Sequence, residues 1–211
     1  MTGELATRRK DWVETRQLIL ETFARMIVED GVRDVSIQQV ADRAGIAHRT
    51  VYRHFSTRQD LVEELAEWLA DRDPESGNVT NVHDVDDIPA AVIESARSFD
   101  RRADLITALV IATWESGTVS RIQQQRTEEL EKLLSPFTAH LEPDQARCLI
   151  ALLRYIGSSR FWYLLREEHG LTGDVSGPVV AWVFQVLLDA LRDPADPGPG
   201  GVGRKDQNDD Q

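Results

Sequence analysis

The stretch GIAHRTVYRHFSTR, residues 45–58, holds the strongest structural signal in the chain. No aspartate or glutamate occurs between Arg43 and Gln59, although the protein has a formal net charge of −12. The window contains four arginines and two histidines: Arg43, Arg49, Arg53, Arg58, His48 and His54. A short helix kept basic inside an acidic protein is suited to binding a phosphate backbone, although a solvated basic surface is the plain alternative.

Two short helices are predicted, one before Gly45 and one after it. Ser36 can cap the first helix, residues 37–44, by accepting hydrogen bonds from the free amides of its first turn. Gly45 can adopt the positive φ that ends this helix, and a second one follows from about Ala47 to Phe55. Small and apolar residues would fill the space between the two: Val40, Ala41, Ile46 and Val51. This arrangement is typical of a helix-turn-helix.

Helical periodicity extends over nearly the whole chain, so we expect an all-α fold. Besides the two helices above, we expect helices at about 11–29, 58–72, from 88 onward, 104–116, 118–135, 144–168 and 178–191. Gly31 is expected to end the first of them, and residues 74–87 read as a loop. Residues 193–211 are rich in proline and glycine and are expected to be a disordered tail.

Charge is distributed unevenly along the chain. Residues 1–60 contain 10 Lys and Arg against 9 Asp and Glu, whereas the remainder contains 14 against 27. This asymmetry indicates two parts with different partners. A single cysteine, a polar N-terminus and the shortness of the apolar runs favour a cytoplasmic protein without a membrane span.

The N-terminal pattern resembles the TetR family of transcriptional regulators. The resemblance covers roughly residues 11–65: a helix ending at Gly31, the segment SIQQVA at 36–41, GIAHRTVYRHF at 45–55, then Arg58 and Leu61. Arg58 stands where the family usually has lysine, so the positive charge is retained. The resemblance implies a helix-turn-helix DNA-binding domain at 1–57 with a basic N-terminal arm, and a helical ligand-binding and dimerisation domain at 58–192.

The geometry of the second short helix divides its residues between two faces. Val51 and Phe55 are four residues apart and are expected to face the core. His48, Arg49, Tyr52 and Arg53 would then share the outward side, which can enter a major groove. The resemblance implies phosphate contacts by Thr50, Tyr52 and His54, and it places His48, Arg49 and Arg53 nearest the base edges. Gln38 is another candidate for a base contact. Ser36 and Arg58 complete the expected DNA-binding set, with Arg58 and free helix amides holding a phosphate.

The last two predicted helices are unusually apolar, so they need contacts on more than one side, either in a homodimer or in a monomeric core. The resemblance implies that they pair with those of a second copy, and that the middle helices enclose a small, mostly apolar ligand. The candidate pocket residues are Phe99, Trp114, Glu115, Tyr155, Ser158, Ser159 and Trp162. Ordinary packing remains the alternative for each of them.

No cofactor, metal site or catalytic set is expected. His83 with Asp84, Asp86 and Asp87 reads as a solvated loop and helix cap, and Cys148 as an inert core thiol. The leading hypothesis is therefore a transcriptional repressor released from a palindromic operator by a small molecule. The alternatives are a helix-turn-helix regulator controlled by a protein partner and, as a third, an enzyme built on a helical bundle.

Overall fold

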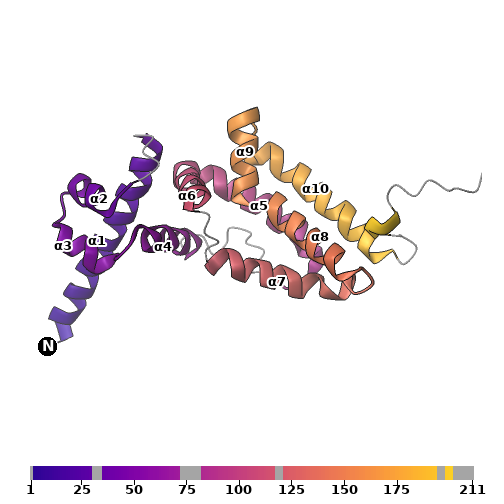
Figure 1. Ribbon diagram of the computed structural model, residues 1–211, viewed down its shortest axis with the longest axis horizontal. Coiled ribbons are helices and arrows are strands. Elements are labelled where there is room, and N and C mark those ends of the chain that lie inside the picture. Colours follow the sequence, from indigo (N-terminus) through magenta and orange to yellow (C-terminus); the bar gives the residue numbers. More distant parts are fainter. Residues whose placement is uncertain (1, 30–34, 72–81, 117–120, 194–197, 202–211) are drawn as a thin grey trace, which may run out of the picture. The chain divides into compact units, whose positions relative to one another are not determined.

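The computed structural model describes residues 2–29, 35–71, 82–116, 121–193 and 198–201, and these contain helices and no strand (Figure 1). The chain divides into two compact units. Unit 1 comprises Met1–Pro74 and Phe99–Gln124, and unit 2 comprises Glu75–Ser98 and Gln125–Gln211. The all-α fold is confirmed. The expected helix end at Gly31, the loop before residue 82 and most of the tail lie outside the described residues.

Unit 1 contains α1 (Thr2–Glu29), α2 (Ile37–Ala44), α3 (His48–His54), α4 (Arg58–Asp71) and α6 (Ala103–Ser116). The predicted bounds of α2, α3 and α4 are confirmed to within a residue or so. α1 begins at Thr2 rather than near Asp11, so the expected basic arm is helical, because this segment has good helix formers and no proline. α4 and α6, grouped with the C-terminal domain in the sequence analysis, cluster with α1 here.

The core of unit 1 follows the predicted helix faces. On α1 the buried stripe runs through Ile19 and Phe23, whereas Leu18 is exposed. From α4, Leu61 and Leu65 are fully buried, and this helix packs against α1 and α6. Other buried side chains of unit 1 include Leu20, Ile27, Val40, Val51, Phe55, Val62 and Leu69.

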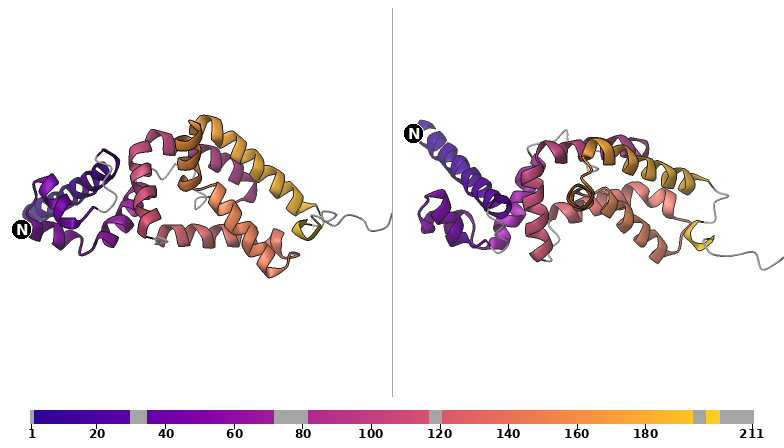
Figure 2. Two further views of the ribbon diagram at one scale, coloured as in Figure 1. Left: turned by 45° about the horizontal axis from the view of Figure 1, so that its top comes forward. Right: turned by 90° about the horizontal axis from the view of Figure 1, so that it is seen from above.

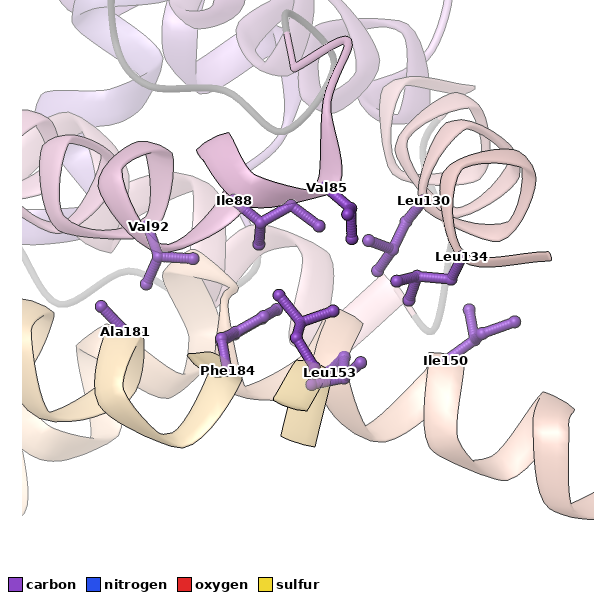
Figure 3. Close-up of a cluster of buried hydrophobic side chains, with 10 residues drawn as sticks. Val85, Ile88, Val92, Leu130, Leu134, Ile150, Leu153, Ala181 and Phe184 are labelled. Carbon is purple, nitrogen blue, oxygen red and sulfur yellow. The ribbon is translucent and has the colours of Figure 1, made fainter. Parts of the chain in front are cut away.

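Unit 2 contains a 3-10 turn η2 (Val85–Asp87), all but the last residues of α5 (Ile88–Arg101), all but the first residues of α7 (Arg121–Thr138), and the whole of α8 (Pro143–Ile156), α9 (Ser159–His169) and α10 (Gly173–Arg192). Its buried cluster joins Ile88 and Val92 of α5 to Phe184 of α10, and further members come from α7 and α8 (Figure 3). α10 runs beside α5 in both views of Figure 2. A short 3-10 turn, η3 (Gly198–Gly201), lies in the tail.

Three predicted helix boundaries in unit 2 are wrong. The single helix expected at 144–168 breaks at Gly157 and Ser158, and Ser158 starts α9 by accepting a hydrogen bond from Phe161 N at 3.3 Å. α7 continues through Pro136. Proline has no N–H to donate to the Lys132 carbonyl, and the Ser135 hydroxyl donates to this carbonyl instead, at 3.1 Å. The third concerns α10.

α10 begins at Gly173 instead of Pro178, so the glycine-rich stretch before the proline is helical. Gly177 accounts for this. A Cβ at this position would lie 3.1 Å from Ala96 Cβ and 3.3 Å from Ile93 Cα, so only glycine lets α10 approach α5 this closely. An ion pair between Arg97 of α5 and Asp174 of α10, at 3.0 Å, holds the same two helices together.

Candidate nucleic-acid interface

The turn between α2 and α3 is built by local hydrogen bonds. Ser36 Oγ accepts from Gln39 N at 3.2 Å while Ser36 N donates to Gln39 Oε1 at 2.8 Å, a reciprocal cap that starts α2. Gly45 ends it with φ 67° and ψ 29°, the left-handed conformation. Ile46 N then donates to Ala41 O at 3.0 Å, which closes the turn. These contacts set the direction in which α3 leaves the turn.

α3 presents the side chains that its spacing predicts. Val51 is fully buried and Phe55 nearly so, and together they hold α3 on the core. The predicted outward set is exposed: His48, Arg49, Tyr52 and Arg53, with half of Tyr52 accessible. Gln38 and Ser36 are also exposed, and Thr50 is half-buried. The outward face of α3 therefore carries two arginines and an aromatic phenol without a carboxylate of its own.

His48 has a partner that the sequence analysis missed. Its Nε2 lies 2.6 Å from Oδ1 of Asp42 on α2, across the turn. Both side chains are exposed, so this contact orients the imidazole ring more than it stabilises the fold. Asp42 lies just outside the acid-free window, and its six-residue separation from His48 gave no sequence signal.

His54 is placed differently from the expectation. It is only 9% exposed, and its ring packs 3.7 Å (centroid to centroid) from the ring of Trp12 on α1. Burial, reinforced by the charges of Arg16 and Arg53, lowers the pKa of His54. This placement does not favour the predicted phosphate contact, because the ring is covered by Trp12 and tends to stay neutral.

Trp12 is a second residue that the sequence analysis missed. It forms one wall of an open groove of about 540 Å³ between α1 and α3, with Thr15, Thr50 and Arg53 among the other lining residues. The guanidinium of Arg53 lies 5.1 Å from the centroid of the Trp12 ring, a cation–π contact. α1 thus supports the basic face of α3 from the side. In the sequence, the only indication of this contact is an aromatic residue four positions before Arg16.

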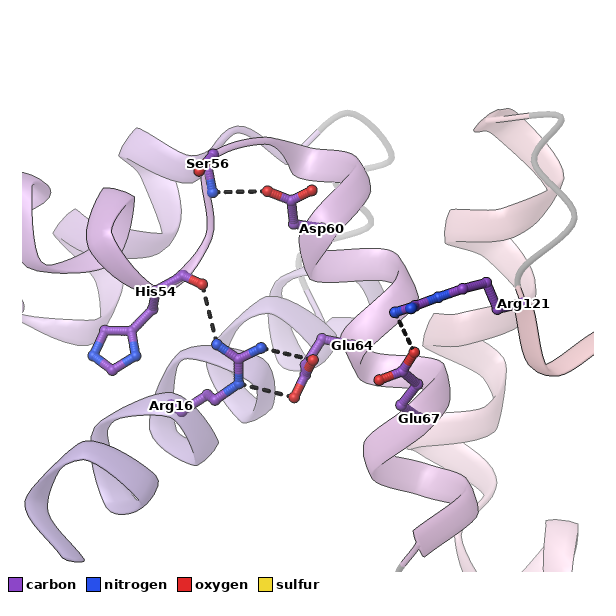
Figure 4. Close-up of polar contacts among 7 residues, drawn as sticks. All are labelled: Arg16, His54, Ser56, Asp60, Glu64, Glu67 and Arg121. Carbon is purple, nitrogen blue, oxygen red and sulfur yellow. Dashed lines mark hydrogen bonds and ion pairs between the residues drawn. The ribbon is translucent and has the colours of Figure 1, made fainter. Parts of the chain in front are cut away.

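Arg16 joins α1, α3 and α4 (Figure 4). Its guanidinium meets Glu64 of α4 with two nitrogens, Nε to Oε1 at 2.8 Å and Nη2 to Oε2 at 2.6 Å. Its third nitrogen, Nη1, donates to the carbonyl of His54 at 3.1 Å, at the end of α3. The same group lies 4.4 Å from the centroid of the Phe55 ring. One half-buried side chain therefore links the orientation of α3 to the position of α4.

The first turn of α4 caps itself. Asp60 Oδ2 accepts from Ser56 N at 2.8 Å and from Thr57 N at 3.0 Å, while Thr57 Oγ1 accepts from Asp60 N. A hydrogen bond between the Thr57 side chain and the Asp60 carboxyl, together with those from the two backbone amides, lowers the pKa of Asp60. The backbone amides of Ser56 and Thr57 are therefore not free to hold a phosphate together with Arg58, contrary to the prediction for these two amides. Arg58 itself is half-buried, 6.0 Å from the centroid of the Phe23 ring.

The far end of α4 is tied to the other helices of unit 1. Glu67 Oε1 lies 2.6 Å from Arg121 Nη2 at the start of α7 (Figure 4), and the Leu69 carbonyl accepts from Arg102 Nη1 at 2.6 Å. Because Arg16 holds the opposite half of the same helix, a displacement of α4 would be felt at α3.

The candidate pocket residues fall into both units. Phe99 lies on α5, and Trp114 and Glu115 on α6, in unit 1, where the Trp114 side chain is 54% exposed. The other four lie around the junction of α8 and α9 in unit 2: Tyr155, Ser158, Ser159 and Trp162. Trp162 is buried and Tyr155 is exposed, with its ring 6.0 Å from that of Phe161.

Cys148 corrects an expectation. It is exposed on α8, not buried as an inert core thiol. The reason is helical phase, because the buried face of α8 passes through Ile150 and Leu153 and leaves Cys148 on the opposite side with Leu152 and Tyr155.

Known proteins share this architecture. A sequence profile described as bacterial regulatory proteins of the TetR family matches residues 19–65, which contain α2, α3 and the start of α4. The chain is 25% identical to the HTH-type transcriptional regulator TtgR of Pseudomonas putida over 198 residues, which cover 85% of this chain and 92% of that protein. It is 42% identical over 53 residues to an HTH-type transcriptional regulator of Staphylococcus aureus, a match to 25% of this chain and only 29% of that protein.

A solved structure supports the fold. The TetR-family regulator PfmR of Thermus thermophilus superposes with a TM-score of 0.52 at 16% identity, over 81% of this chain and 93% of its own. At this level of identity the likeness concerns the fold alone.

Proposed function

Because the chain is a TetR-family transcriptional regulator, we propose that it binds a palindromic operator as a homodimer and leaves it when a small molecule occupies unit 2. Regulators of this family are typically repressors, and ligand control is typical of them. They are soluble DNA-binding proteins, which supports a cytoplasmic location. The named relatives are regulators and not enzymes.

The observation that carries this proposal is the outward face of α3. Arg49, Arg53 and Tyr52 are exposed there on a helix whose other side is locked to the core by Val51 and Phe55. An exposed arginine at the front of such a helix can form two hydrogen bonds with the O6 and N7 atoms of guanine, worth about 1–3 kcal/mol of discrimination. The Tyr52 hydroxyl can donate to a phosphate oxygen beside it.

A dimer is required by the length of α3. Seven residues reach one stretch of major groove, and two copies of α3 about 34–36 Å apart would meet two successive grooves on one side of the DNA. Palindromic half-sites follow from the two-fold symmetry of such a dimer.

The apolar surface of unit 2 supports a dimer through α8 and α10. On α10 four large apolar side chains are between 47% and 66% exposed and recur every three or four residues: Val175, Val179, Trp182 and Val186. On α8, Leu152 and Tyr155 are also exposed apolar side chains. By length and composition α10 could also cross a membrane, a property that core helices of soluble proteins share. Exposed apolar surface of this extent is typical of a protein–protein interface, and we assign it to a second copy of this chain.

DNA binding is tested by fluorescence anisotropy with DNA that flanks the gene of this protein. Wild-type protein should bind one site with a palindromic sequence, and Arg49→Ala should weaken binding by about 1–3 kcal/mol and relax the preference at one base pair. Arg147→Ala is the matched control, since it removes an exposed arginine of unit 2 that pairs with Asp144. Equal effects of the two substitutions would refute the assignment of α3 as the reading helix.

Dimerisation is tested separately by light scattering on the eluting protein. Trp182→Glu should shift the mass from dimer towards monomer because it introduces a charge into the centre of the apolar surface. His140→Glu adds a charge at an exposed position after α7 and should leave the dimer intact. A monomeric wild-type protein, or a Trp182→Glu variant that remains as dimeric as the control, would refute the proposed interface.

A further inference from the structure

Arg49 and Arg53 have equivalent places in the sequence pattern but different surroundings in the structure. They are four residues apart on α3, so their side chains lie on one face of the helix, a turn apart, and both are exposed. The guanidinium of Arg53 lies 5.1 Å from the centroid of the Trp12 ring of α1. Among the described residues, no ion pair, hydrogen bond or ring contact holds the guanidinium of Arg49. Only one of these two arginines is therefore tied to α1.

The ring of Trp12 is held in place from within the fold. Its centroid lies 3.7 Å from that of the His54 ring, and the two planes are 31° apart. His54 is itself buried, and its carbonyl accepts a hydrogen bond from Arg16 Nη1 at 3.1 Å (Figure 4). Trp12 remains 38% exposed, so an exposed guanidinium can reach the indole. A cation is attracted to the face of such a ring, which biases Arg53 towards α1.

The groove between α1 and α3 shows where this leaves Arg53. Thr50 lies three residues before Arg53, and both line the groove on its α3 side. Asp11 lines it on the α1 side and forms no ion pair with Arg53 among the described residues. The negative charge of Asp11 disfavours a phosphate near α1. A phosphate is therefore expected at the α3 edge of the groove, within reach of the Thr50 hydroxyl and of Arg53.

The position of an arginine on a helix in the major groove decides what it contacts. A guanidinium can form two hydrogen bonds with guanine or with a phosphate equally well. Side chains at the centre of the outward face meet base edges, whereas those drawn to the flank meet the phosphates that border the groove. Arg53 is drawn to the flank by Trp12, and Arg49 stays at the centre.

We propose that Trp12 is a positioning residue for DNA binding: its ring holds Arg53 at the α1 side of α3, where Arg53 contacts a phosphate, and Arg49 is left to read a base pair. The proposal rests on the DNA contact by α3 proposed above. It assigns Arg53 a phosphate in place of the base edge expected from the sequence. Trp12 acts through Arg53 and needs no contact of its own with DNA.

The first test separates a phosphate contact from a base contact. Full-length protein is titrated by fluorescence anisotropy against DNA that flanks its gene and against a scrambled duplex of the same composition, at salt concentrations of about 50–200 mM. Arg53→Met should weaken binding to both duplexes by the same factor and reduce the slope of log K against log salt by about 0.9. Arg49→Ala should instead lower the ratio of the two affinities.

The second test asks whether Trp12 acts through Arg53. Trp12→Leu should weaken binding to both duplexes about two- to fivefold, and Trp12→Phe should retain most of the affinity because it keeps an aromatic face. In an Arg53→Met background, Trp12→Leu should have no further effect. A merely structural role of Trp12 would weaken binding in both backgrounds. Trp114→Leu is the matched control, an exposed tryptophan of α6 whose loss should leave both affinities unchanged.

Three results would overturn the proposal. Arg53→Met could lower affinity for the flanking DNA alone, which would make Arg53 a base reader. Trp12→Leu could bind as wild type does, or it could weaken binding by the same factor with and without Arg53. If wild-type protein binds both duplexes equally, the operator proposal fails, and the test of Trp12 still holds on either duplex. A wild-type protein that binds neither duplex would refute the DNA contact by α3 and the role of Trp12 together.

Discussion

Replacing Arg16 by methionine should destabilise the protein by about 2–3 kcal/mol. The substitution keeps an unbranched, apolar side chain and removes both hydrogen bonds to Glu64 and the one to the His54 carbonyl. The side chains of Arg16 and Glu64 are 29% and 27% exposed, so the pair is more strongly coupled than a surface pair but is not fully desolvated. Hydrogen bonds to charged groups contribute about 1.5–3 kcal/mol each in favourable cases, and partial solvent screening reduces the sum.

A double-mutant cycle separates the ion pair from the other contacts of Arg16. Glu64→Gln keeps the shape of the side chain and leaves the contacts of Arg16 with α3 in place, so it should cost less, about 1 kcal/mol. The coupling energy between the two positions should be about 1–2 kcal/mol. Urea unfolding followed by circular dichroism gives these values, at one protein concentration for all variants because association contributes to stability.

The exposed pair Lys10–Glu14 is the control. Its atoms are 3.7 Å apart and its side chains are 75% and 63% exposed, so its coupling should not exceed about 0.5 kcal/mol. A coupling for Arg16 and Glu64 that equals this control would show that the ion pair does not hold α4. A cost of Arg16→Met no greater than that of Glu64→Gln would refute the role of the His54 carbonyl.

Three further outcomes are expected. Gly45→Ala should cost about 1–2 kcal/mol in urea unfolding, because its φ of 67° is strained for alanine although no atom lies within 4 Å of the added Cβ; a neutral result would show that the turn relaxes. Gly177→Ala should cost about 1–3 kcal/mol and lower the melting temperature, since Ile93 and Ala96 must move, and an unchanged value would contradict the close approach of α5 and α10. His54→Gln should flatten the pH dependence of stability. The lowered folded pKa of His54 means that the unfolded chain binds the proton more readily, so wild-type stability should fall as the pH drops through about 6.5 towards the folded pKa and be constant above it. If stability still falls with pH in His54→Gln, another titratable group causes the dependence.

Local sequence patterns predicted the N-terminal part well because its signals act over short distances. Ser36 and Gly45 bracket α2 through a cap and a positive φ, and both effects involve neighbours within four residues. The faces of α3 followed from the spacing of Val51 and Phe55. Predictions of helix ends failed at Pro136 and before Pro178, where a side-chain hydrogen bond and a close helix contact override the usual effect of proline and glycine.

The contacts that support α3 could not be predicted in this way. Arg16 and Glu64 are 48 residues apart, and Trp12 and His54 are 42 positions apart, so only the folded chain brings them together. Without that packing His54 reads as one more basic residue for a phosphate, and Cys148 as part of a core.

The sequence by itself determined the class of this protein: an all-helical chain with a capped turn and a helix kept free of carboxylates, because caps, turn conformations and helical spacing are local. Only the tertiary structure decided which basic residues remain available. It buried His54 under Trp12 and engaged Arg16 in holding α4. The physical reason is that the role of a charge depends on its distance from counter-charges and from water, and both distances are properties of the packed chain.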